Sequence, residues 1–283
     1  MKNVIACIDG SKATDTVCDY ASWVAGKLNT SLTLLHVLDG TAQPVEKDLS
    51  GKLGVDAREQ LLSELAAQDT QRNKQALEQG RLILDAVKQR AIANGVTDPV
   101  LRQRHGQVVD SLVELEDDIG VLVFGRQGEA HSDDSDVGSH VERMVRSVHR
   151  PMLIVHGEYT APQTLMLAFD NSDIARQGVE LLATNPLFQG LDIHLVSVGK
   201  DKKSLRKSLD WAEQTLVNAG GTVQCAVLEE SDIQAALDNY QQEHNIDMIV
   251  MGAYGHTRLL EFFVGSTTNK MIRNASVPLF ILR

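Results

Sequence analysis

Short apolar runs alternate with amphipathic stretches along the chain, and the pattern is clearest in its C-terminal half. Apolar runs typical of buried strands cover residues 165–169, 192–198, 223–228, 248–251 and 278–282. Helical patterns cover residues 172–183, 203–219, 232–244 and 266–274. Strands that alternate with helices predict a parallel sheet with right-handed crossovers and helices on both faces.

The N-terminal half follows the same course. Its strands are predicted near residues 3–8, 32–37, 100–105, 120–124 and 152–156. The first strand of each half also ends alike, in VIACIDGS from Val4 and in LMLAFDNS from Leu165, so that Asp9 corresponds to Asp170. We therefore expect a duplication, with one doubly wound domain over residues 1–157 and a second over 158–283.

A glycine motif follows the fourth predicted strand of each half. It reads Gly-x-x-Gly, then nine residues, then Gly-Ser. Its members are Gly125, Gly128, Gly138 and Ser139 in the first half, and Gly252, Gly255, Gly265 and Ser266 in the second. The identical spacing favours a true repeat over coincidence.

The first half carries an insertion. Asp9 and Gly125 are 116 positions apart, whereas Asp170 and Gly252 are 82 apart, so this segment is 34 residues longer in the first half. The extra residues fall within about 40–98, where a polar loop precedes a helical pattern from about 56 to 93. We expect an amphipathic helix that covers the sheet or a neighbouring element.

Composition and charge narrow the class of protein. The chain has 283 residues and a net charge of −11, with both halves acidic, which argues against binding to nucleic acid. Its three cysteines form neither a disulfide framework nor a zinc motif. The apolar runs are too short for a signal peptide or a membrane span. We expect a cytoplasmic protein that does not enter the membrane.

The glycine motif suits a nucleotide. Glycines allow tight turns and the close approach of a ligand, and the N-terminus of the helix that Ser266 opens can bind phosphate. Asp170, directly after the first strand of its half, could accept hydrogen bonds from an amino group or a ribose hydroxyl. The alternative is structural, with the glycines shaping turns and Ser266 capping a helix.

Motifs of catalysis are missing from the sequence. It contains no Walker A loop, dinucleotide G-x-G-x-x-G, H-E-x-x-H or G-x-S-x-G. Without a P-loop lysine and a paired carboxylate for magnesium, efficient phosphoryl transfer lacks its usual groups. Binding is therefore favoured over catalysis, and no catalytic residue is assigned.

With its glycine motif, its Asp after the first strand and its closing Val-Pro-Leu-Phe-Ile-Leu strand, the chain resembles the universal stress protein family, in particular its tandem two-domain members. The resemblance implies flavodoxin-like α/β domains, binding of ATP or a related adenine nucleotide, with or without Mg²⁺, and a role in stress resistance. Carried over by motif, the binding residues are Asp170, Gly252, Gly255, Gly265 and Ser266, with Val198 beside the adenine. The first-half counterparts are Asp9, Gly125, Gly128, Gly138 and Ser139.

The two glycine loops differ in charge. Residues 129–137 hold four acids and no Lys or Arg, whereas residues 256–264 hold one acid, Arg258 and His256. Each acid would repel a triphosphate by an energy on the order of 1 kcal/mol. We therefore predict a nucleotide site in the second half and a degenerate one in the first. The acidic loop also allows a metal site at His131, Asp133 and Asp136, although a solvated loop is the simpler interpretation.

The last strand of each half needs cover because it is an apolar edge. The resemblance implies dimerisation through this strand, so Met152–Val155 and Leu279–Leu282 are expected to pair within the chain as a pseudo-twofold dimer, with further homodimerisation left open. Two alternative functions remain beside a nucleotide-binding regulator. One is a nucleotide-free scaffold or a binder of another small ligand or metal, and the other is a slow ATPase or autophosphorylating enzyme.

Overall fold

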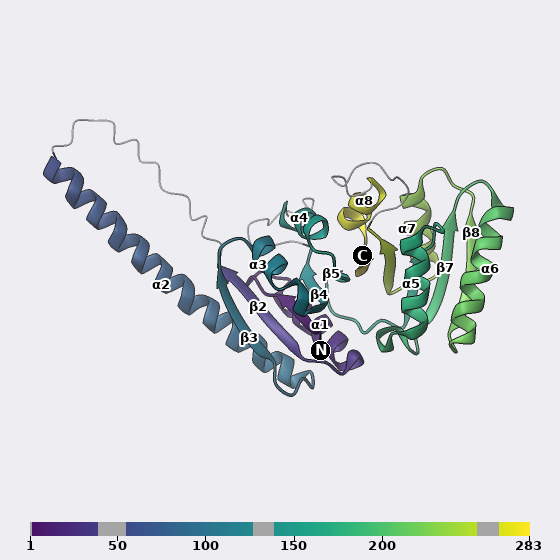
Figure 1. Cartoon of the computed structure of the whole chain (residues 1–283), viewed down its shortest axis with the longest axis horizontal. Coiled ribbons are helices and arrows are strands. Elements are labelled where there is room, and N and C mark those ends of the chain that lie inside the picture. Colours follow the sequence, from purple (N-terminus) through teal and green to yellow (C-terminus); the bar gives the residue numbers. More distant parts are fainter. Residues whose placement is uncertain (1, 39–54, 127–138, 254–265) are drawn as a thin grey trace.

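The computed structural model describes residues 2–38, 55–126, 139–253 and 266–283 (Figure 1). For residues 55–65, 69, 139, 140, 266 and 267, only the backbone is described.

Both halves contain five strands with helices between them. The first half consists of β1 (Asn3–Cys7), α1 (Thr14–Leu28), β2 (Leu32–Leu38), α2 (Val55–Ala93), β3 (Val100–His105), α3 (Val108–Glu114), the 3₁₀ turn η1 (Glu116–Asp118), β4 (Ile119–Gly125), α4 (Ser139–Ser147) and β5 (Met152–Val155). The second consists of β6 (Thr164–Ala168), α5 (Asp173–Thr184), the 3₁₀ turn η2 (Pro186–Phe188), β7 (Asp192–Val198), α6 (Lys202–Asn218), β8 (Thr222–Leu228), α7 (Ile233–Glu243), β9 (Met248–Gly252), α8 (Ser266–Asn274) and β10 (Leu279–Leu282). The strands predicted from the apolar runs are confirmed to within about two residues.

The ten described strands form one sheet in the order β3-β2-β1-β4-β5-β10-β9-β6-β7-β8. Neighbouring strands within each half are parallel, while β5 and β10 are antiparallel, with Phe280 opposite Leu153. The predicted pairing of the last strands within one chain is confirmed. It relates the two halves by a pseudo-twofold axis and leaves β3 and β8 as the outer strands.

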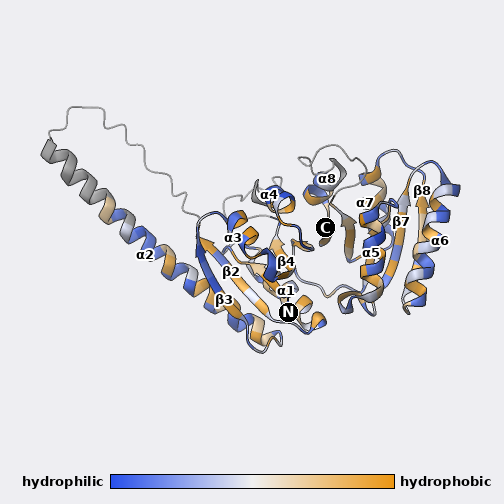
Figure 2. Cartoon of the chain, viewed as in Figure 1, coloured by the Kyte–Doolittle hydropathy of each residue, from blue (hydrophilic) through white to orange (hydrophobic). Residues whose placement is uncertain are grey.

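Helices cover both faces of the sheet, and each face has a continuous apolar core. One core contains α1 and the end of α2 from the first half together with α5 and α6 from the second. The other contains α3, α4, α7 and α8. Figure 2 shows hydrophobic residues along inner strands such as β2 and β7, whereas the outer strand β3 is largely hydrophilic. Inner strands that are covered by helices on both faces are expected to be apolar in this way.

The inserted helix α2 was expected to cover the sheet or a neighbouring element, and only its C-terminal part does so. At Gly80 it lies so close to the sheet that an added Cβ would be 2.6 Å from the His36 ring and 2.3 Å from Gln103. Beyond it, Leu84, Val87 and Ala91 are buried. Before it, the described side chains from residue 66 to residue 79 are exposed, except for half-buried Ala76. The first part of α2 thus projects from the body instead of covering it (Figure 1).

Candidate functional site

The second-half candidate residues gather at one edge of the sheet. Strand β6 lies between β9 and β7, with Leu167 paired to Val250 and Ala168 to Val196. Asp170, Gly252 and Val198 therefore stand at the carboxyl ends of three adjacent strands. The connection after β6 leads to β7 on one side, whereas β9 lies on the other. This is the position at which doubly wound sheets form their ligand crevice.

The loop after β6 has a defined geometry. One carboxylate oxygen of exposed Asp170 accepts a hydrogen bond from the Ser172 amide at 3.0 Å. Asn171 has a φ of +63°, a left-handed conformation that Asn adopts more readily than most residues. Ser172 then caps α5 by accepting from the Ala175 amide at 3.2 Å. The side-chain oxygen Oδ1 of Asn171 is buried and has no hydrogen-bond partner among the described residues.

Gly252, which ends β9, is needed for packing. A Cβ added there would lie 2.9 Å from Cγ2 of Ile174, so the absence of a side chain lets the start of α5 approach the strand. Next to it, the Ala253 carbonyl accepts a hydrogen bond from the buried Thr268 hydroxyl at 3.2 Å. This bond holds the first turns of α8 against the end of β9. Val198 ends β7 and is half-buried.

The charge beside the second strand differs between the halves. In the second half, Gly199 and exposed Lys200 follow β7 directly. Lys202, two residues further on, pairs with Glu229 at 3.0 Å. At the position equivalent to Lys200, the first half has Asp39, which lies outside the described residues. In the loop after the first strand of each half, the difference in charge is reversed. There the first half has the basic Lys12 where the second half has the acidic Asp173.

In the first half, the inserted helix occupies space beside the corresponding loop. Half-buried Asp9 accepts hydrogen bonds from the Ser11 amide at 3.0 Å and the Thr14 hydroxyl at 3.4 Å. Gly10, which matches Asn171, has a φ of +80°, and a Cβ there would lie 2.9 Å from Cδ1 of Ile83. Gly125 ends β4, the neighbour of β1. Helix α2 therefore lies where the second half carries the Asn171 side chain.

Several predicted residues fall outside what the structure describes. These are Gly128, Gly138, Gly255 and Gly265, together with the acidic-loop residues His131, Asp133 and Asp136. Ser266 begins α8 as predicted, and its counterpart Ser139 begins α4, although only the backbone of these two residues is described. Among the described residues, no group of three His, Cys, Asp or Glu side chains is arranged to hold a metal ion. None of the described helices is both long enough and apolar enough to cross a membrane.

Sequence reasoning missed Asn171 and Thr268. The repeat itself could have identified the first, because it aligns Asn171 with Gly10, and both residue types tolerate a left-handed backbone. Thr268 corresponds to Val141, so this hydrogen bond to a strand end belongs to the second half. The sequence indicated Thr268 only as a polar residue on an otherwise apolar face of the predicted helix.

Comparison with known proteins agrees with the fold. The family model described as the universal stress protein family matches residues 1–156 and 200–283. Universal stress protein Slr1230 of Synechocystis sp. is 30% identical over 288 residues, covering all of both chains. A universal stress protein from Archaeoglobus fulgidus superposes with a TM-score of 0.72 at 19% identity, covering 99% of this chain and 95% of that one. A putative universal stress protein from Pseudomonas aeruginosa gives 0.64 at 12% identity, with 100% and 93% covered. The chain therefore belongs to the universal stress protein family.

Proposed function

We propose that the protein binds ATP or a related adenine nucleotide in its second half, at the carboxyl edge of β9, β6 and β7, and acts in the stress response as a regulator or scaffold. The observation that carries this proposal is the convergence of Asp170, Val198 and Gly252 at the point where strand order reverses. We also propose that residues 1–157 and 158–283 are the two domains of this assembly.

The described residues fit an adenine nucleotide. The unpartnered Oδ1 of Asn171 is a buried acceptor, and an amino or hydroxyl group of a nucleoside would satisfy it. Exposed Lys200 supplies positive charge for a phosphate at the same edge. The N-terminus of α8, held on β9 through Thr268, would contribute backbone amides to the phosphates. Bound Mg²⁺ would offset phosphate charge.

The first half is proposed as a degenerate site. Its glycine loop carries four acids, and Asp39 stands where the second half has Lys200. Ile83 of α2 also packs against Gly10, where the second half has Asn171. Negative charge and the inserted helix therefore both disfavour a triphosphate there.

Matched variants of the two halves test this assignment by isothermal titration with ATP. Asp170→Asn and Gly265→Asp should each weaken binding about tenfold or more, equivalent to about 1.4 kcal/mol. Their repeat counterparts, Asp9→Asn and Gly138→Asp, should leave the affinity within about twofold. If only the first-half changes abolish binding, the assignment to the second half is wrong.

Two further measurements separate the alternative functions. Mass spectrometry of the gently purified protein should find a bound adenine nucleotide, and its absence together with no ATP binding in titration would favour a nucleotide-free scaffold. A phosphate-release assay should show no turnover above that of Gly265→Asp. Turnover that this variant abolishes would identify a slow ATPase instead.

A further inference from the structure

The two outer strands of the sheet differ in how their edges are protected. Strand β3 carries Arg102 and Arg104, which pair with Asp118 at 3.7 Å and Glu114 at 2.6 Å. Charged side chains on an edge strand discourage pairing with another chain. Strand β8 reads TVQCAVL, with no charge and no proline, and it pairs with β7 over all seven residues without a bulge. Its edge has none of these protections.

The backbone of β8 has a definite outward side. The Gly199 amide donates to the Leu228 carbonyl at 2.9 Å, so the backbone groups of Leu228 face β7. Because these groups alternate in direction along a strand, Val223, Cys225 and Val227 point theirs away from the sheet. No other backbone group in the described part of the chain bonds to them.

This outward set is complementary to a second copy of itself. Val223 and Val227 are equally spaced about Cys225, so an antiparallel twofold would place Cys225 opposite itself and Val223 opposite Val227. Each of the three residues would then exchange both an N–H and a C=O with its counterpart. The remaining neighbours, Gln224 and Ala226, would also face each other, and no charged side chains of β8 would meet.

The helix over this edge is compatible with such pairing. Glu213 of α6 lies beside Cys225, and burial together with Glu213 raises the pKa of that thiol to about 12, so the thiol stays neutral. Arg206 pairs with Asp210 at 3.0 Å and with Glu213 at 2.8 Å, which offsets part of the acidic charge near the axis. Val217, one turn beyond Glu213 on the same side of the helix, is 49% exposed and adds apolar surface.

We propose that β8 is a self-association edge, through which two copies of this chain pair antiparallel about an axis at Cys225 and extend the sheet across both. The chain already joins its two halves by antiparallel pairing of edge strands β5 and β10. Antiparallel pairing of edge strands would then occur again at β8, the uncharged strand at the other edge of the second half. This inference does not depend on nucleotide binding.

Sedimentation equilibrium over a range of concentrations tests the association. The wild-type chain should approach twice its monomer mass, and Gln224→Lys should weaken dimerisation about tenfold or more, because two lysines would lie diagonally across the axis. Gln177→Lys, the same change at an exposed position on α5, should behave as wild type. A chain that stays monomeric at every concentration would overturn the proposal. The β8 edge would then be available to pair with an extended segment of another protein instead.

The register can be tested separately by mixing two variants, Gln224→Cys and Ala226→Cys, with oxidised glutathione as the oxidant. Both variants also carry Cys225→Ala, because Cys225 would lie opposite itself across the axis and could form a disulfide in either variant alone. These positions form a non-hydrogen-bonded pair across the axis, with Cα atoms about 4.5 Å apart, which a disulfide can bridge. The mixture should yield a covalent dimer that neither variant gives alone. Dimers that sediment at twice the mass but show no such cross-link use another surface, and would also overturn the proposal.

Discussion

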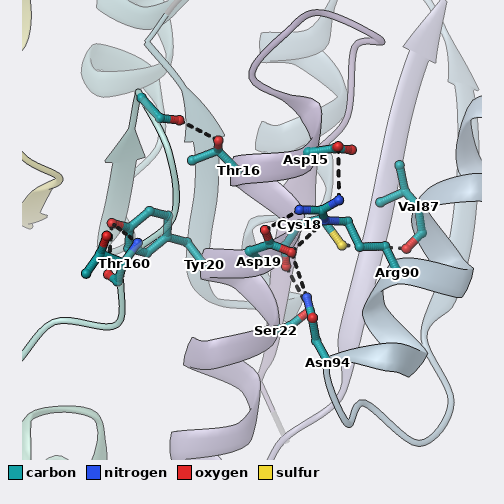
Figure 3. A network of polar contacts seen from close by, with 11 residues as sticks. Asp15, Thr16, Cys18, Asp19, Tyr20, Ser22, Val87, Arg90, Asn94 and Thr160 are labelled. Carbon is teal, nitrogen blue, oxygen red and sulfur yellow. Dashed lines mark hydrogen bonds and ion pairs between the residues drawn. The ribbon is translucent and has the colours of Figure 1, made fainter.

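Arg90, near the C-terminal end of α2, joins the inserted helix to α1 (Figure 3). Its guanidinium donates to both carboxylate oxygens of Asp19, at 2.7 and 2.6 Å, and to Asp15 at 3.0 Å. Asn94 adds a hydrogen bond to Asp19 at 2.7 Å. Burial alone would raise the pKa of Asp19, but the bonds from Arg90 and Asn94 outweigh it and hold that pKa below its usual value. Bidentate pairing of this kind is among the stronger polar contacts in proteins.

Replacing Arg90 should therefore destabilise the protein. Arg90→Ala leaves a largely buried Asp19 carboxylate without its cation, and we expect a loss of about 1–3 kcal/mol in urea unfolding at neutral pH. Because the pKa of Asp19 is lowered in the folded state, this stability is present above about pH 4 and is lost as the pH falls through that lowered pKa. The difference between wild type and variant should shrink in that range.

Arg81→Ala serves as the matched control on the same helix. Its exposed pair with Glu78 should contribute within about 0.5 kcal/mol. Equal losses for the two arginine variants would contradict the role assigned to the Arg90 contacts.

His194 should make the stability of the second half depend on pH. It is 5% exposed, and its Nδ1 lies 2.9 Å from the Tyr240 hydroxyl oxygen. Burial lowers the pKa of His194, and the neighbouring His244 lowers it further. The unfolded chain therefore binds a proton at His194 more readily than the folded one does, so stability should fall as the pH drops below about 6.5.

A His194→Gln variant should show a weaker decline in unfolding free energy between about pH 7 and pH 5 than the wild type. Part of the decline should remain, because burial and Arg126 also lower the pKa of His156. His105→Gln, at an exposed position, is the control and should keep the wild-type slope. Identical slopes for all three proteins would show that His194 does not contribute.

At the scale of elements, α2 divides into a packed part and a projecting part. The boundary lies at Gly80, which contacts His36 and Gln103, and Gln103 also donates to the Leu77 carbonyl at 3.2 Å. Helical periodicity predicted the helix but not this division, because apolar positions recur on both sides of the boundary. Only the packing of the helix against the sheet, which buries its side chains from Gly80 onward, decides which of them are buried.

Shortening α2 should separate these two parts. Replacing residues 41–74 by a Gly/Ser linker of about eight residues removes no described buried side chain, so the free energy of unfolding should change by less than about 1 kcal/mol. Removing buried contacts at the other end, with Leu84→Ala, should cost about 2–5 kcal/mol. A shortened chain as unstable as Leu84→Ala would show that the projecting part supports the fold.

Of the candidate site, the sequence predicted only the residues that lie at the ends of strands. Parallel topology places Asp170, Val198 and Gly252 together, because apolar runs identify the strands and the carboxyl ends of parallel strands share one edge. The reason for Gly252 was not predictable, since its contact with Ile174 joins elements far apart in the sequence. Nor was the insertion of Ile83 beside Gly10, which depends on the path of α2 across the first half.

At the scale of the whole molecule, the two halves support each other across the pseudo-twofold axis. Arg283, after β10, donates to the carbonyls of Val145 and Val148 at the C-terminal end of α4. Arg126, after β4, donates to the Ala275 carbonyl at the end of α8, at 2.8 Å. Each arginine thus places a cation at the negative end of the other half's helix dipole. Arg273 of α8 also pairs with Glu142 of α4 at 3.0 Å.

The apolar core on one face of the sheet is also shared by the two halves. Phe280 of β10 is 1% exposed, stacks edge-to-face on Phe188 at 5.2 Å, and belongs to a core that includes α1 of the first half. Lys27 of α1 also donates to the Gln189 carbonyl at 3.3 Å. Because the core is shared, we expect the two halves to unfold as one cooperative unit, although chains of this length often unfold in steps.

The two tryptophans allow a direct test, since Trp23 lies in α1 and Trp211 in α6. Trp211→Phe leaves a fluorescence probe of the first half, and Trp23→Phe leaves one of the second. Both should report the same urea midpoint. Adding Phe280→Ala should lower the two midpoints together, by a free energy of about 3–5 kcal/mol, because the cavity lies in the shared core. Adding Leu82→Ala, at a side chain that is 58% exposed, should move neither. If Phe280→Ala shifts the Trp211 signal alone, the halves fold independently and β5–β10 pairing only tethers them.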